Sequence, residues 1–101
     1  MQIQTIAKAG KVFVERRAFR DSRNLDYFEQ DVIDCICHLI PSDYYESMEY
    51  DDDTDSTRLR KLKFDVYRTR CNNSMRQTDD LYLKLRLSRG VWLFVGSFKQ
   101  Q

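Results

Sequence analysis

Alternating leucines near the end of the chain constrain its fold most strongly. From residue 81 to 88, leucine occupies every odd position, and the even positions are Tyr82, Lys84, Arg86 and Ser88. Successive side chains of a β-strand point to opposite faces, so this alternation predicts a strand with one apolar and one polar face. We expect the leucine face to pack on a core and the polar face to meet solvent.

A second alternating segment predicts a neighbouring strand. Phe64 and Val66 alternate with polar and aromatic residues, and we assign both to the core side. The polar face of the predicted sheet then combines residues from both strands: Lys63, Asp65, Tyr67, Tyr82, Lys84 and Arg86. A loop over 71–80 connects these strands, and the pair Arg89-Gly90 favours a tight turn into a third strand over 91–97.

Apolar residues recur at helical spacing in the first half of the chain. One stripe ends at Gly10, and a longer stripe over 26–40 ends at Pro41, which cannot continue a helix. Residues 42–48 begin with Ser42, a favourable N-cap, and predict a short helix. We interpret residues 11–14 as a short strand or connector, and residues 15–24 as containing a further helical turn. These elements predict an α+β fold of two layers, with N-terminal helices packed on a C-terminal antiparallel sheet.

Length and composition predict the class of protein. With 101 residues, of which 42% are hydrophobic, the chain is expected to form one folded domain over 1–101. No apolar run approaches the roughly 20 residues that a membrane helix needs, and the first residues lack a signal-peptide pattern. Three cysteines, an odd number, favour free thiols in a reducing compartment. We therefore expect a cytoplasmic protein without membrane contact.

Two short patterns resemble metal sites, and neither is convincing. The aspartates at 51, 53 and 55 begin like a calcium loop, but Ser56 and Leu62 stand where that loop needs glycine and glutamate. Cys35 and Cys37, which precede His38, are two residues apart on a predicted helix and therefore point to nearly opposite sides, and no second ligand pair exists. We expect no metal site, and we interpret His38 as a capping or surface residue.

Charge is distributed unequally along the chain. Residues 1–55 hold 6 basic and 13 acidic side chains, whereas residues 56–101 hold 11 basic and 3 acidic ones. A basic sheet face that also carries tyrosines suits single-stranded RNA, because cations bind phosphates and aromatic rings stack on bases. The alternative is a solvated face with cross-strand ion pairs, and the acidic residues 50–57 are either a solvated loop or a docking segment for a basic partner.

Several segments together resemble one family, the MqsR toxins of type II toxin–antitoxin systems. The similar segments are, in order, 6–12, 32–36, Ser42 to Met48, Asp65 to Arg70, Leu81 to Lys84 and Gly96 to Lys99. The resemblance implies a RelE-like fold and an endoribonuclease that cuts messenger RNA without metal or cofactor. It also implies a cognate antitoxin that holds the toxin inactive, and it leaves association with the ribosome open.

The resemblance further implies catalytic residues. The family's catalytic tyrosine falls on Tyr82 and its C-terminal lysine on Lys99, whereas a family lysine falls on Glu46 and a family glutamine on Phe64. We hypothesise that Glu46 serves as a base and that nearby side chains supply the missing charge and bind RNA: Lys63, Tyr67, Arg68, Arg70, Lys84 and Arg86. The alternative is a catalytically degenerate member that binds RNA or antitoxin without cleaving.

Overall fold

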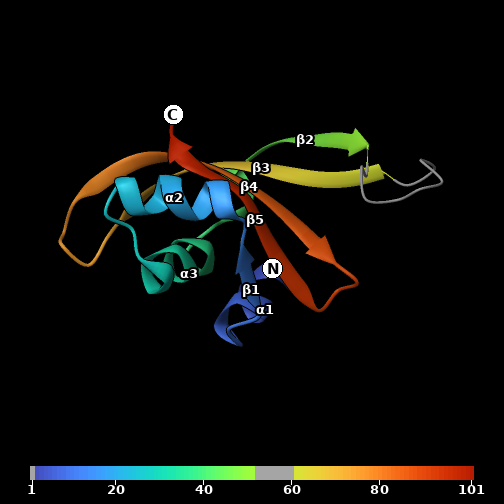
Figure 1. The fold of residues 1–101 in the computed structure, drawn as a ribbon, viewed down its shortest axis with the longest axis horizontal. Coiled ribbons are helices and arrows are strands. Elements are labelled where there is room, and N and C mark those ends of the chain that lie inside the picture. Colours follow the sequence, from blue (N-terminus) through green and yellow to red (C-terminus); the bar gives the residue numbers. More distant parts are fainter. Residues whose placement is uncertain (1, 52–60) are drawn as a thin grey trace.

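The leucines of one central strand pack against the helices, as their alternation predicts. The computed structural model describes residues 2–51 and 61–101 of the chain (Figure 1). In strand β4 (Thr78–Ser88), Leu81, Leu83 and Leu85 are at most 2% exposed and belong to the main core cluster. Burying one such side chain stabilises the fold by about 1.5–3 kcal/mol, so this row holds the sheet on the helices.

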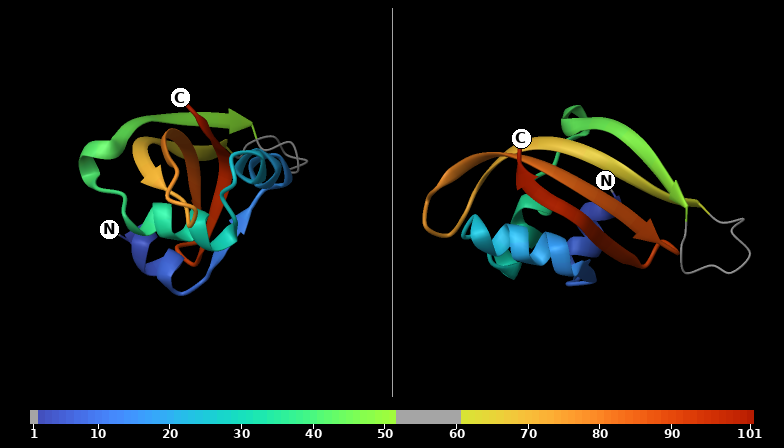
Figure 2. Two further views of the ribbon diagram at one scale, coloured as in Figure 1. Left: turned by 90° about the vertical axis from the view of Figure 1, so that its left-hand side faces the viewer. Right: turned by 45° about the horizontal axis from the view of Figure 1, so that its top comes forward.

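Three helices cover one face of a five-stranded sheet (Figure 2). The helices are α1 (Gln2–Lys8), α2 (Arg16–Asn24) and α3 (Glu29–Cys37), followed by the 3-10 turn η1 (Pro41–Asp43). The other strands are β1 (Val12–Val14), β2 (Tyr44–Asp51), β3 (Lys61–Asn72) and β5 (Trp92–Gln100). The strand order is β1-β5-β4-β3-β2, and β1 runs parallel to β5 while the remaining neighbours are antiparallel. The predicted α+β class is confirmed.

Local sequence signals set most element boundaries. Helix α1 is followed by Gly10 at a φ of 75°, and α3 ends before Pro41. At the start of α3, Asp31 accepts a hydrogen bond from the backbone N–H of Phe28 at 3.0 Å. Arg89 and Gly90 both adopt positive φ, as a tight turn between β4 and β5 requires. None of the described helices combines the length and apolar character needed to cross a bilayer.

The helix predicted at 42–48 is wrong. After η1 the chain continues as β2, which pairs antiparallel with β3, and Tyr44 lies opposite Tyr67. Aromatic residues favour strands that can pair with a neighbour, and the short segment satisfied a helical spacing equally well. The acidic segment predicted at 50–57 begins within β2. Its residues from 52 onward lie outside the described residues, and so does most of the calcium-like aspartate pattern.

The predicted faces of β3 are also reversed. In the observed register Val66 lies opposite Lys84, and Tyr67 lies opposite Leu83. Cross-strand neighbours share a face, so Asp65 and Tyr67 face the helices, whereas Phe64 and Val66 face away from them. Both sets contain apolar residues, so the pattern of β3 alone did not distinguish the two faces. The loop after β3 is also shorter than predicted, because Cys71 and Asn72 pair with Asp79 and Thr78.

Gly96 of β5 has no side chain, which leaves room for Phe64 on the face away from the helices. The pairing of β4 with β5 shifts between Lys84 and Leu85, and Gly96 lies at this irregularity. A Cβ atom at Gly96 would approach Cε1 of Phe64 to 2.8 Å, which is closer than side chains tolerate. Phe64 is therefore 7% exposed although it lies outside the helix-facing core.

A buried polar network ties the helices to the end of the β3–β4 hairpin. The Tyr27 hydroxyl lies 3.0 Å from both the carbonyl oxygen of Cys71 and Oδ2 of Asp79. Gln77 Nε2 donates to Asp79 Oδ2 at 2.8 Å, and Gln100 Nε2 donates to Asp79 Oδ1 at 3.0 Å. Burial by itself raises the pKa of Asp79, but these donors outweigh it and hold the pKa below its ordinary value.

We expect Asp79→Asn to destabilise the fold at neutral pH by about 1–3 kcal/mol. The NH₂ group of the new amide would face Tyr27, Gln77 or Gln100, which all donate hydrogen bonds to Asp79, so one of these bonds would be lost. The folded pKa of Asp79 is lowered, so its contribution is present above about pH 4 and is lost as pH falls through the folded value. Denaturant titrations from pH 7 to pH 3 should therefore show a smaller acid loss in the variant.

The matched control is Asp80→Asn, since Asp80 is exposed and paired only with Arg70 among the described residues. Its effect at pH 7 should be much smaller than that of Asp79→Asn. Equal stability losses for the two variants would contradict a structural role for the buried network.

Candidate functional site

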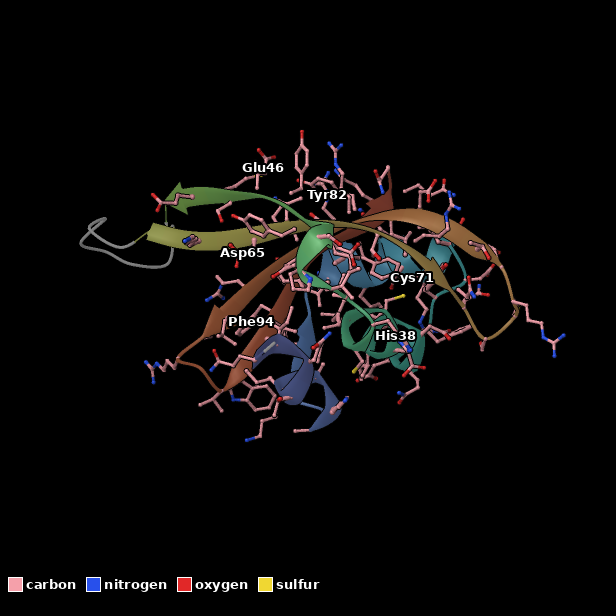
Figure 3. The ribbon with its side chains drawn as sticks, turned by 180° about the vertical axis from the view of Figure 1, so that it is seen from behind. His38, Glu46, Asp65, Cys71, Tyr82 and Phe94 are labelled. Atoms are coloured by element: carbon pink, nitrogen blue, oxygen red, sulfur yellow. The ribbon has the colours of Figure 1, made fainter. Side chains whose placement is uncertain are left out.

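The face of the sheet turned away from the helices carries most of the predicted site residues, and we call it the outer face. Figure 3 shows Glu46 and Tyr82 on this side of the sheet, whereas His38 lies with α3 on the other side. Register and alternation assign further side chains to the outer face: Met48, Phe64, Val66, Arg68, Arg70, Asp80, Lys84, Arg86, Phe94 and Lys99. The outer face is therefore basic and aromatic.

Tyr82 and Lys99 form the centre of the outer face. They lie directly opposite each other on β4 and β5, and Nζ of Lys99 is 5.1 Å from the centroid of the Tyr82 ring. On the other side of Tyr82, β3 places Arg68 directly opposite it. The Tyr82 hydroxyl donates to Sδ of Met48 at 3.7 Å, a weak contact that a better acceptor would replace. A phenol thus lies between two cations on adjacent strands.

Arg68 stacks on a tyrosine that the sequence reasoning did not select. Its Cζ atom is 3.6 Å from the centroid of the Tyr45 ring, and the Tyr45 side chain is 51% exposed. The register of β2 shifts between Tyr44 and Glu46, so Tyr45 is an extra residue in the pairing. The only indication of Tyr45 in the sequence was the pair of adjacent tyrosines, Tyr44 and Tyr45, and both lay in a segment predicted to be helical.

Arg70, another cation of the outer face, is paired with an acidic residue of the same face. Its Nε atom lies 2.8 Å from Oδ1 of Asp80, and both side chains are largely exposed. The hydrogen bond and the charge of Arg70 hold the pKa of Asp80 below its ordinary value. Since Asp80 compensates this charge, Arg70 is a weaker RNA-binding candidate than the sequence suggested.

Lys84 and Arg86 pack against phenylalanine rings. Nζ of Lys84 is 5.6 Å from the centroid of Phe64, while Cζ of Arg86 is 5.7 Å from Phe64 and 4.3 Å from Phe94. The ring of Phe64 thus contacts two cations of the outer face. Phe64 therefore holds the charged ends of Lys84 and Arg86 through its ring, whereas a polar side chain would hold them through hydrogen bonds.

Glu46 brings a carboxylate onto the basic outer face. It is exposed and lies opposite Val66, which in turn lies opposite Lys84. Glu46 is therefore two strands from Lys84 in the same row across the sheet. The outer face therefore carries side chains of both signs of charge.

Two predicted RNA-binding residues lie on the wrong face. Tyr67 is 6% exposed on the helix side, and its ring packs edge-on against Tyr44 at a centroid distance of 5.8 Å. Burial, followed by the nearby Asp65 and Tyr44, raises the pKa of Tyr67. Lys63 alternates with Phe64 and so also belongs to the helix side, directly opposite Glu49. The reversed faces of β3 explain both corrections.

A second group of chemical side chains lies between α3 and β3. Asp31, Asp34, Cys35, His38 and Cys71 line part of a pocket of about 390 Å³. Cys35 and Cys71 are buried free thiols, and the hydrogen bond between them, together with burial, raises the pKa of Cys35. His38 is an exposed C-cap residue, as predicted, with Nδ1 2.7 Å from the carbonyl oxygen of Asp34. Over residues 2–51 and 61–101 no three metal-ligating side chains form a cluster.

Comparison with known proteins identifies the family. The model of the family described as "Motility quorum-sensing regulator, toxin of MqsA" matches residues 1–100. No curated protein matches the chain. Because the match covers nearly every residue, including both strands that carry Tyr82 and Lys99, the chain belongs to the MqsR toxin family of toxin–antitoxin systems, whose partner is an antitoxin.

Proposed function

We propose that this toxin is an endoribonuclease that cleaves single-stranded messenger RNA on the outer face, with protein side chains rather than a metal ion carrying the chemistry. The pairing of Tyr82 with Lys99 supports this proposal most directly, since Nζ lies 5.1 Å from the ring centroid. A phenol beside an ammonium group provides a proton donor and a positive charge at one place. Both are needed when a phosphodiester is broken.

The reaction uses the 2′-hydroxyl of the RNA as nucleophile. Glu46 accepts the proton of this hydroxyl while its oxygen forms a bond to the adjacent phosphorus, and Lys99 stabilises the charge of the phosphorane. Tyr82 donates its proton to the departing 5′-oxygen as the P–O bond breaks. The products are a 2′,3′-cyclic phosphate and a 5′-hydroxyl, so atoms and charge balance without a co-reactant.

Cations on both sides of Tyr82 bind the RNA backbone. Arg68, Lys84 and Arg86 lie on β3 and β4 around the Tyr82–Lys99 pair, and the exposed Tyr45 ring offers a stacking surface beside Arg68. About four phosphate contacts would give an affinity that falls with salt with a log–log slope near −3 for a single strand. The antitoxin would act by covering this face, and association with the ribosome remains a prediction.

We expect Tyr82→Phe to reduce cleavage of an unstructured RNA in EDTA by about 10²–10⁴-fold, the usual contribution of a proton donor. The variant should fold and bind RNA normally, because the hydroxyl makes only the 3.7 Å contact with Met48 among the described residues. Tyr67→Phe is the matched control, since Tyr67 lies on the neighbouring strand but faces the helices. Cleavage that survives in Tyr82→Phe would exclude Tyr82 as the acid.

Removing the negative charge of Glu46 distinguishes two roles for this residue: a base in the reaction, or a group that only repels phosphate. Glu46→Gln should lower the single-turnover cleavage rate by about 10²–10⁴-fold and leave RNA affinity equal or tighter, because a base is lost together with a repulsive charge. Glu49→Gln is the control, as Glu49 lies on the same strand opposite Lys63. Faster cleavage in Glu46→Gln would show that the carboxylate only repels phosphate.

Product formation distinguishes the proposed enzyme from a degenerate binding protein. Both would bind RNA in a salt-dependent way, but only the enzyme yields fragments ending in a cyclic phosphate. Steep salt dependence without fragments, in the presence and absence of ribosomes, would assign the outer face to binding alone.

A further inference from the structure

Two phenylalanines, Phe13, which is exposed, and Phe94, which is partly buried, form an aromatic pair on the outer face, away from the Tyr82–Lys99 centre. Phe13 of β1 lies beside Phe94 of β5 in the parallel register, and their ring centroids are 5.3 Å apart at an angle of 54°. Val12 and Val14 pack against the helix-side core, so Phe13 between them points to the outer face. Phe13 is 54% exposed, so part of its side chain is accessible to a ligand.

An arginine that has no acidic partner among the described residues borders this pair. Cζ of Arg86 lies 4.3 Å from the Phe94 centroid, and Arg86 is directly opposite Phe94 in the register. Its Nε atom is buried and has no hydrogen-bond acceptor in the part of the chain that the structure describes. No described carboxylate lies within ion-pair distance of it either. The positive charge beside the aromatic rings is therefore uncompensated by the described residues.

The aromatic pair is continuous with the proposed catalytic centre. Arg86 follows Tyr82 by four residues on β4, which corresponds to about 13 Å along a strand, and Lys84 projects from the same face between them. An RNA strand that passes the Tyr82–Lys99 pair and continues along β4 would reach Phe13 and Phe94 within a few nucleotides. Cations line this route as far as the aromatic pair.

We infer that Phe13, Phe94 and Arg86 form a second RNA subsite, in which a nucleobase a few nucleotides from the scissile phosphate stacks on Phe13 while Arg86 binds the neighbouring phosphate. This inference rests on the proposed function and adds a place where flanking RNA is held. An exposed ring beside a cation that no described residue compensates matches the two chemical parts of a nucleotide. A purely apolar protein segment would gain nothing from the charge of Arg86, so RNA is the favoured occupant.

Binding of a labelled single-stranded RNA, measured by fluorescence anisotropy in the Tyr82→Phe background, tests the subsite without cleavage. Phe13→Ala should weaken binding roughly 5- to 150-fold, the equivalent of about 1–3 kcal/mol for one base–aromatic stack. An RNA too short to extend from the centre to β1 should bind both proteins equally. Phe13→Leu keeps apolar bulk but removes the ring, so it should also bind weakly, and Phe13→Trp should restore binding.

Phe19→Ala is the matched control for loss of an exposed ring. Phe19 is 42% exposed, and Arg23 lies 4.8 Å from its ring centroid, but this similar pair is on α2. The Phe19→Ala variant should bind RNA as tightly as its parent does. Equal affinity of Phe13→Ala and its parent for long RNA would overturn the subsite, while cleavage by the unmodified chain would still uphold the proposed enzyme.

The remaining outcomes also decide between the two proposals. If the unmodified chain neither binds nor cleaves RNA, the proposed function and the subsite both fall. If Phe13→Ala loses affinity for the antitoxin but keeps its affinity for RNA, the aromatic pair belongs to a protein interface, and the subsite is overturned.

Discussion

Burial of the β4 leucine row on the helices is the constraint on which the other features of this toxin depend. Leu81, Leu83 and Leu85 together contribute several kcal/mol by leaving water, whereas turning β4 over would bury Lys84 and Arg86. The orientation of β4 then determines which side chains its neighbours present, through cross-strand pairing. Because the side-chain period of a strand is two, this single choice places Tyr82, Lys99 and Arg68 on the same outer face.

Aromatic rings hold several cations of the outer face in place. Arg68 stacks on Tyr45 and Arg86 on Phe94, while Arg70 has an ion pair with Asp80. A ring holds a guanidinium in place without neutralising it, so the charge stays available to a phosphate. Phe64 fits this arrangement because Gly96 leaves room for its ring. The outer face thus keeps several positive charges next to aromatic rings, and Glu46 adds a negative group.

The polar groups that close the other end of the sheet serve stability rather than chemistry. Asp79 accepts hydrogen bonds from Tyr27, Gln77 and Gln100, and Asp31 caps α3 while accepting a bond from the backbone N–H of Ser74 at 2.9 Å. These aspartates are satisfied and buried on the helix side, in contrast to the exposed Glu46. The same residue type therefore has different roles on the two faces of the sheet.

The sequence by itself determined the α+β class, the polar face of β4 and the turn at Arg89-Gly90, because period-two alternation and positive-φ residues are local signals. It also pointed to Tyr82, Lys84 and Arg86 on one face, whereas Lys99 and Glu46 came from family resemblance. Only the tertiary structure decided that 44–51 is a strand, that Tyr67 faces the helices and that Tyr45 supports Arg68. Those features depend on pairing between strands distant in sequence, and β3 carries apolar residues on both faces, so no local pattern could specify its register.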